Sequence, residues 1–185
     1  LRRSRTRELT ARFAEVWQAA GPDHAVVRRD LHRDPLPHLP DAALHWPRRL
    51  RPADAAPPAD VEALQQALID ELTAADVLLV GAPLYNYTVP STLKSWLDYV
   101  HVPGVTVPFD EPTQPMTGRP AVVVTSQGVA YDPGTPTEGQ DHAVPVLQIL
   151  LGQALGMELT VVTVPLGLAA TVPAVADQRE RAHSE

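Results

Sequence analysis

The run Ala121-Val122-Val123-Val124-Thr125 constrains the fold more than any other part of this sequence. Consecutive apolar and β-branched residues, without alternation between polar and apolar, are typical of a strand that is buried on both of its faces. Both faces are covered when helices lie above and below a parallel sheet. The run therefore predicts an α/β protein rather than an all-β or an all-α one.

Further strands and helices alternate along the chain, which predicts a doubly wound parallel sheet with right-handed crossovers. Apolar residues at helical spacing place Leu9, Phe13, Val16 and Trp17 on one face of the first helix. The proline-dotted residues 34–58 predict an irregular surface excursion. The predicted strands are residues 25–27, 77–82, 121–125 and 159–164, the last also buried, and the predicted helices are residues 6–19, 60–74, 90–100, 143–155 and 173–183.

Length and composition indicate one globular domain over residues 1–185, since the sequence contains no repeat and no linker. A net charge of −7 argues against a nucleic-acid surface. No apolar run approaches the about 20 residues of a membrane span, so no membrane partner is expected. The sequence has no cysteine, which excludes disulfides and thiolate metal sites and is compatible with a reducing cytoplasm. The seven histidines are not spaced as metal ligands, so no metal site is expected.

Three polar or aromatic segments fall where ligand loops lie in open α/β sheets, at the carboxyl ends of strands and at a helix start. Each also has an ordinary structural interpretation. The first segment can be a simple helix cap, the second a structural turn with a packed tyrosine, and the third a strand-to-helix turn with glycine at positive φ. The segments are Ser4-Arg5-Thr6, Pro83-Leu84-Tyr85-Asn86-Tyr87 and Ser126-Gln127-Gly128-Val129.

The chain resembles the FMN-dependent NADH-azoreductase and quinone reductase family, through PLYNYTVPSTLKSWLDYV, TGRPAVVVTS and LGQALGM. The resemblance extends from about Ser4 to the last predicted helix. It implies a flavodoxin-like fold with strand order 2-1-3-4-5 and helices on both faces. It also implies an FMN site in which Ser4, Arg5 and Thr6 hold the phosphate. Pro83, Leu84, Tyr85, Asn86 and Tyr87 would then run along the flavin ring, and Ser126, Gln127, Gly128 and Val129 would lie on its other side.

By the same resemblance, the chain is expected to use NADH or NADPH to reduce quinones and azo compounds by a ping-pong mechanism. No side chain is expected to act as an essential acid or base, because the flavin carries the redox chemistry. A homodimer is implied, and residues 143–155 are apolar on more sides than one sheet face would bury, which suits an interface. Two alternatives stay open: a flavin-binding electron carrier without turnover, and a truncated, inactive relative.

Several positions depart from the family pattern. Gln127 replaces an arginine, and Val129 replaces a glycine, so its side chain is expected to crowd the flavin. Val107 replaces an aromatic residue that follows a Gly-x-Thr motif, and Tyr131 stands where the family often has a histidine. We expect Val107 and Tyr131 to line the substrate pocket.

The chain opens on the first ligand segment, with no apolar strand before it. In the order 2-1-3-4-5, such a strand would lie between residues 25–27 and 77–82. We therefore expect the functional protein to carry about ten or more residues before Leu1, including a β-branched apolar strand. A strand gap would otherwise leave backbone donors and acceptors unpaired.

Overall fold

The computed structural model describes residues 4–165, 167 and 175, and within them three parallel strands form one sheet. The strands are β1 (Leu78–Pro83), β2 (Pro120–Ser126) and β3 (Glu158–Val164), in the order β1-β2-β3. Their register aligns Val80 with Val123 and Val123 with Val161. Because all three strands run the same way, their carboxyl ends meet at one edge of the sheet. The predicted parallel sheet is confirmed.

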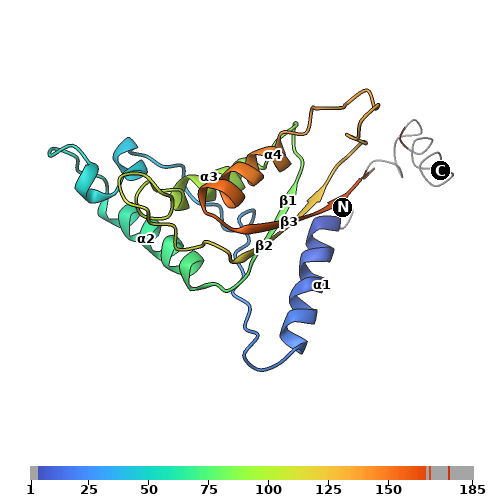
Figure 1. The fold of residues 1–185 in the computed structure, drawn as a ribbon, viewed down its shortest axis with the longest axis horizontal. Helices are drawn as coiled ribbons and strands as arrows, with labels where there is room; N and C mark the ends of the chain where they lie inside the picture. The colour runs from blue at the N-terminus through green and yellow to red at the C-terminus, as the bar shows by residue number, and fades with distance from the viewer. Residues whose placement is uncertain (1–3, 166, 168–174, 176–185) are drawn as a thin grey trace.

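Helices cover both faces of this sheet, as predicted (Figure 1). Helix α1 lies on one side, and helices α2, α3 and α4 lie on the other (Figure 1). Helix α4 continues directly into a π-helical segment, η3, so that the two form one element of predicted length. The bounds are α1 (Arg5–Ala19), α2 (Ala59–Ala74), α3 (Ser91–Val100), α4 (Ala143–Leu147) and η3 (Gln148–Ala154), with short 3-10 turns η1 (Ala42–His45) and η2 (Arg48–Leu50).

The main core lies between the sheet and the helices α2, α3 and α4. Val123 of β2 is fully buried there, together with Leu147 and Leu151 of the long α4–η3 element. Segment 34–58 is irregular as predicted, apart from two short 3-10 turns. Its Leu36 and Leu39 pack against the core. It is tied down by the buried Gln65 of α2, whose Nε2 donates to the carbonyl of Leu44 at 2.9 Å.

Helix α1 forms where it was predicted but buries a different face. Leu9 and Val16 are 40% and 56% exposed, whereas Thr6 and Ala14 are buried. The reason is close approach of the helix to β1: a Cβ on Gly81 would lie 3.2 Å from the Thr10 methyl group. Only small side chains fit at that distance, so the large apolar side chains of α1 point elsewhere. The apolar face that the sequence defines is therefore not the face that α1 turns toward the sheet.

Residues 25–27 are not a strand, contrary to the prediction. They form no regular element, Val27 is 77% exposed, and no described segment pairs with their backbone. Side chains hold the following residues instead: Arg29 forms a two-bond ion pair with Glu71 of α2, at 2.7 and 3.0 Å. A β-branched run becomes a strand only where a neighbouring backbone supplies its hydrogen bonds.

Strand β3 is present, but it is not buried on both faces as predicted. Within the described residues it is an edge of the sheet, and Val162 is 43% exposed. An apolar run alone does not separate an edge strand from a central one. The predicted helix at residues 173–183 lies outside the described residues, apart from residue 175. No helix in the described part of the chain is long and apolar enough to cross a membrane.

Two glycines in neighbouring loops, one before β2 and one before β3, give a stability test of this fold. Gly118 and Gly156 have φ of +74° and +75°, and the Gly118 N–H donates to the Gly156 carbonyl at 2.8 Å. A Cβ on Gly118 meets nothing within 4 Å, but a Cβ on Gly156 would lie 2.7 Å from Gln114 Cδ. Gln114 Nε2 donates to the carbonyls of Gln153 and Ala154 at the end of η3.

We therefore expect Gly118→Ala to lower the free energy of unfolding by about 1–2 kcal/mol, the cost of an L residue at positive φ. Gly156→Ala should cost about 1–2 kcal/mol more, because Gln114 must leave its two carbonyls. Urea unfolding of both variants measures the difference. Equal costs would show that Gln114 does not stabilise the end of η3.

Candidate functional site

The first predicted segment forms the start of α1. Ser4 is the N-cap, and its Oγ accepts from the Arg7 backbone N–H at 3.4 Å. Ser4 and Arg5 are exposed, whereas Thr6 is buried with its Oγ1 3.0 Å from Ser126 Oγ. This hydroxyl pair joins the start of α1 to the end of β2. The first and third predicted segments are thus in direct contact.

The second segment is a tight turn at the end of β1. Tyr85 and Thr88 exchange both backbone hydrogen bonds, at 2.9 and 3.1 Å. Between them Asn86 and Tyr87 have φ of 48° and 70°, as in a type I′ turn. Positive φ is unusual for a bulky residue such as tyrosine. The turn leaves Tyr85 and Tyr87 60% and 53% exposed, so their ring faces are open to a ligand.

The end of β2 joins the second segment to the third. The Leu84 N–H donates to the Ser126 carbonyl at 2.9 Å, and Pro83 stands opposite Ser126 in the register of the sheet. These contacts continue the β1–β2 pairing by one residue beyond β1. The two loops consequently leave the sheet side by side.

The third segment is fixed mainly by Gln127. This residue is buried, its backbone N–H donates to the Val164 carbonyl at 2.9 Å, and its Nε2 donates to Asp141 Oδ2 at 2.6 Å. Val129, expected to crowd the flavin, packs against Val175.

Asp141 is a component of this edge that sequence reasoning missed. Its Oδ1 accepts from the N–H groups of Ala143 and Val144 at the start of α4, and the next residue, His142, donates its N–H to the Tyr87 carbonyl at 2.9 Å. An aspartate just before an apolar helical run is a capping signal that could have identified it.

Tyr131 lies near the same group, as the shift of its pKa indicates. Burial raises the pKa of the Tyr131 phenol, and the negative charges of Tyr87 and Asp141 raise this pKa further. The structure thus brings Tyr131 to the edge that carries the second and third segments.

These segments leave hydrogen-bond donors free. Within the described residues, the backbone N–H groups of Asn86, Tyr87 and Gly128 donate to no acceptor, and neither does the side-chain amide of Asn86. The start of α1 carries backbone N–H groups of the kind that bind anions at helix N-termini. Exposed ring faces, free donors and a helix N-terminus together fit a flat heteroaromatic ligand with acceptors on one edge and a phosphate.

The arginines near the start of α1 are not equivalent. Arg7 forms a two-bond ion pair with Asp30, at 2.5 and 2.9 Å. Its hydrogen bonds hold the pKa of the Asp30 carboxyl well below its usual range. Arg7 is therefore neutralised by a carboxylate, whereas Arg5 in the first turn is exposed. Of these two arginines, Arg5 is the one available to an anion.

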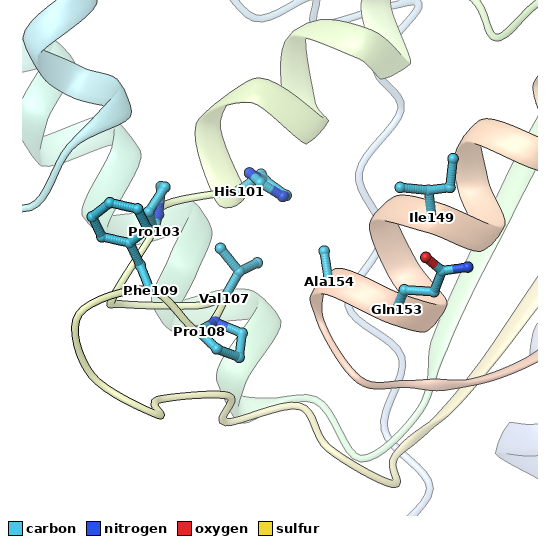
Figure 2. A pocket seen from close by; sticks show the side chains of 8 residues that line it. All are labelled: His101, Pro103, Val107, Pro108, Phe109, Ile149, Gln153 and Ala154. Atoms are coloured by element: carbon cyan, nitrogen blue, oxygen red, sulfur yellow. The ribbon is translucent and has the colours of Figure 1, made fainter.

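Val107 lies elsewhere, in an open apolar groove between the 101–109 loop and η3 (Figure 2). Helix α3 starts just after the Tyr85–Thr88 turn and ends at the groove, and its 10 residues span about 15 Å. Within one chain, Val107 is thus separated from Tyr131. The groove has a volume of about 480 Å³ and is lined by His101, Pro103, Val107, Pro108, Phe109, Ile149, Gln153 and Ala154.

The irregular segment supports one wall of this groove. The Trp46 and Phe109 rings meet edge to face, with centroids 5.3 Å apart. Arg49 donates to the Asp110 carboxylate at 2.8 and 3.1 Å and to the Gly104 carbonyl at 3.1 Å. Phe109 stays 63% exposed on this support. The described residues contain no group of acidic or histidine side chains that could hold a metal ion.

These observations define an α/β protein with a parallel sheet and candidate ligand loops at the carboxyl edge of that sheet. The chain belongs to the flavodoxin-like fold family, whose model matches residues 1–185. An FMN-dependent NADH:quinone oxidoreductase of Kineococcus radiotolerans is 56% identical to it, over 98% of this chain and 86% of the relative. A protein of the same name from Streptomyces coelicolor is 40% identical, over 98% of this chain and 84% of the relative.

Solved structures agree on the fold. An azoreductase from Bacillus anthracis has a TM-score of 0.76 at 20% identity, covering 95% of this chain and 85% of that one. An FMN-dependent NADH-azoreductase from the same species, in complex with FMN, has a TM-score of 0.74 at 17% identity, covering 98% and 90%. At this identity the likeness supports the flavodoxin-like fold alone.

The turn at Asn86 yields a prediction about the ligand-free protein. Asn86 has φ of 48°, a conformation that glycine adopts at little steric cost. Asn86→Gly should therefore raise the free energy of unfolding by about 0.5–1 kcal/mol, and Asn86→Ala should lower it by a similar amount. Urea unfolding of the ligand-free variants measures both changes. A glycine variant less stable than the alanine variant would contradict the positive φ.

Proposed function

We propose that this chain is an FMN-dependent NADH:quinone oxidoreductase. The observation that carries the proposal is the meeting of three predicted segments at one sheet edge, with the Thr6–Ser126 hydroxyl pair between them. The names of relatives aligned over 98% of the chain support it. Azo compounds are a further proposed acceptor class, after the names of structurally similar proteins.

In this proposal the start of α1 holds the FMN phosphate, through its N–H groups, Ser4, Arg5 and the Thr6 hydroxyl. Pro83, Leu84, Tyr85, Asn86 and Tyr87 lie along the ring, where the free N–H groups and the amide meet its acceptors. Ser126, Gln127, Gly128 and Val129 form the other side of the site. Bound FMN would supply the transfer of electrons from the nicotinamide to the acceptor.

The protein's own contribution is to bind the flavin, to orient the flavin and its substrates, and to exclude competing reactions. Exposed aromatic faces at Tyr85 and Tyr87 offer stacking surfaces. Tyr131 borders the place where the acceptor stacks, and its phenol is neutral there, with a pKa that burial raises further above its usual range. No essential acid or base is assigned. Donor and acceptor use one place in turn, which gives a ping-pong mechanism.

A homodimer and a cytoplasmic location complete the proposal. Ile149 on one wall of the groove is 50% exposed and Phe109 on the opposite wall is 63% exposed (Figure 2), and grouped exposed apolar side chains mark interaction sites. In this proposal Val107 lines a substrate pocket that a second copy completes, because within one chain Val107 lies apart from Tyr131. The absence of cysteine from the sequence and the use of NADH both suit the cytoplasm.

Reconstitution tests the cofactor and the reaction together. Protein refolded with both FMN and FAD should retain FMN, because the site has one anion position and the sequence has no dinucleotide fingerprint. Steady-state rates with NADH and a benzoquinone should give parallel double-reciprocal lines. Flavin released on denaturation is identified by chromatography. Retention of FAD, or intersecting lines, would contradict the proposal.

Asn86→Ala is the matched variant for this assay. Removing the free amide should weaken FMN binding by about 1–3 kcal/mol if it is buried against the ring. Fluorescence titration of FMN into the ligand-free protein measures the change. An unchanged affinity would place Asn86 outside the flavin site.

A substitution that introduces a charged side chain into the groove tests the proposed dimer. Ile149→Asp should convert a dimer to a monomer in sedimentation analysis, because a carboxylate there would be buried without a partner. Gln148→Asp adds the same charge to the neighbouring exposed residue, which does not line the groove, and should leave the dimer intact. A monomeric parent protein, or equal behaviour of the two variants, would exclude this interface.

A further inference from the structure

We propose that Asp141 is a positioning residue that holds the two strand-end loops of the flavin site at a fixed separation through its hydrogen bond with Gln127. The inference rests on the proposed function and extends it, since it assigns a role to a residue outside the three predicted segments.

The bases of the two loops are fixed by the sheet itself. β1 and β2 are paired up to Pro83 and Ser126, and the Leu84 N–H donates to the Ser126 carbonyl at 2.9 Å. Beyond this point the loops leave the sheet, and the pairing of β1 with β2 no longer controls the distance between Tyr87 and Gln127.

Asp141 supplies the second connection. One carboxylate oxygen, Oδ2, accepts from Gln127 Nε2 at 2.6 Å. The other, Oδ1, accepts from the N–H groups of Ala143 and Val144 at 2.8 and 3.2 Å, so the carboxylate is anchored to the first turn of α4. The N–H of the adjacent His142 donates to the Tyr87 carbonyl at 2.9 Å. The two loops are therefore joined twice. One connection is the Leu84–Ser126 hydrogen bond at their base, and the other runs from Gln127 through Asp141 and His142 to Tyr87.

The use of both carboxylate oxygens separates this arrangement from an ordinary helix cap. Capping the first turn of α4 needs only Oδ1. Gln127 is 8% exposed, so its amide would be left without a partner if Asp141 moved away. The bond is charge-assisted, and such bonds are shorter and stronger than neutral ones. A displacement at either residue is thus transmitted to the other loop.

The test replaces Gln127 by an isosteric acid. Gln127→Glu places two carboxylates together at pH 8, and their repulsion should separate the loops. FMN affinity, measured by fluorescence titration, should fall about tenfold or more. The matched control is Gln66→Glu on α2, where Gln66 Nε2 also donates to an aspartate, Asp70, at 2.8 Å. This control adds the same charge away from the site and should leave the affinity within about twofold of the parent.

The rescue is Gln127→Glu combined with Asp141→Asn. The new asparagine can donate to the new glutamate while its oxygen still caps α4, and the net charge returns to that of the parent. Affinity should return to within about threefold of the parent value. Failure of the double variant to bind better than Gln127→Glu alone, or an unaffected Gln127→Glu, would overturn the positioning role.

The pH dependence of FMN affinity distinguishes charge repulsion in this variant from a simple loss of packing. At pH 5.5 one proton shared between the introduced carboxyl group of the Gln127→Glu variant and Asp141 restores a hydrogen bond, so the defect of this variant relative to the parent should shrink. Tyr131, Tyr87 and His142 are the other titratable groups at this place. The ratio of affinities removes the pH dependence that they give to the parent. A ratio independent of pH would overturn the proposal.

Two further outcomes are distinguishable. If Gln127→Glu shows no cooperative melt, Gln127→Met removes the donor without adding charge, and it should also weaken FMN binding. Unchanged binding by that variant would count against the role. If the parent protein itself binds no FMN, the proposed function fails, whatever the variants show.

Discussion

The parallel pairing of β1 with β2 is the interaction on which the rest of the structure depends. It places Pro83 opposite Ser126, so the two loops that follow leave the sheet at neighbouring points. The start of α1 reaches the same place because Gly81 allows a close approach of the helix to β1. The Thr6–Ser126 hydroxyl contact follows from both conditions. Without this pairing, three segments far apart in the sequence would not form one site.

Patterns that depend on local burial predicted much of this arrangement. The β-branched run at β2 identified a parallel sheet, and helical spacing located α2 and α3 to within one residue at each end. The ligand segments were found because glycine, proline and polar residues follow buried strands at the edge where such sheets bind ligands. Their detailed role as flavin contacts stays a prediction.

The features that these patterns did not predict depend on contacts between segments far apart in the sequence. Val27 has strand propensity, but within the described residues no neighbouring backbone pairs with its segment, and the chain there is held by ion pairs. Leu9 is as apolar as a core residue, yet α1 buries the face that is small enough to approach Gly81. Asp141 was overlooked because its partner Gln127 is 14 residues away, and no periodicity connects them.

The directions of the helices have a consequence for charge. Helix α1 begins at the ligand edge, α3 begins just after the Tyr85–Thr88 turn, and α4 begins beside Tyr87. Each helix carries partial positive charge at its N-terminus, so three macrodipoles direct their positive ends toward one place. A ligand that gains electrons there gains negative charge in a favourable potential. The topology that assembles the site therefore also favours any state of the ligand that carries more negative charge at these helix N-termini.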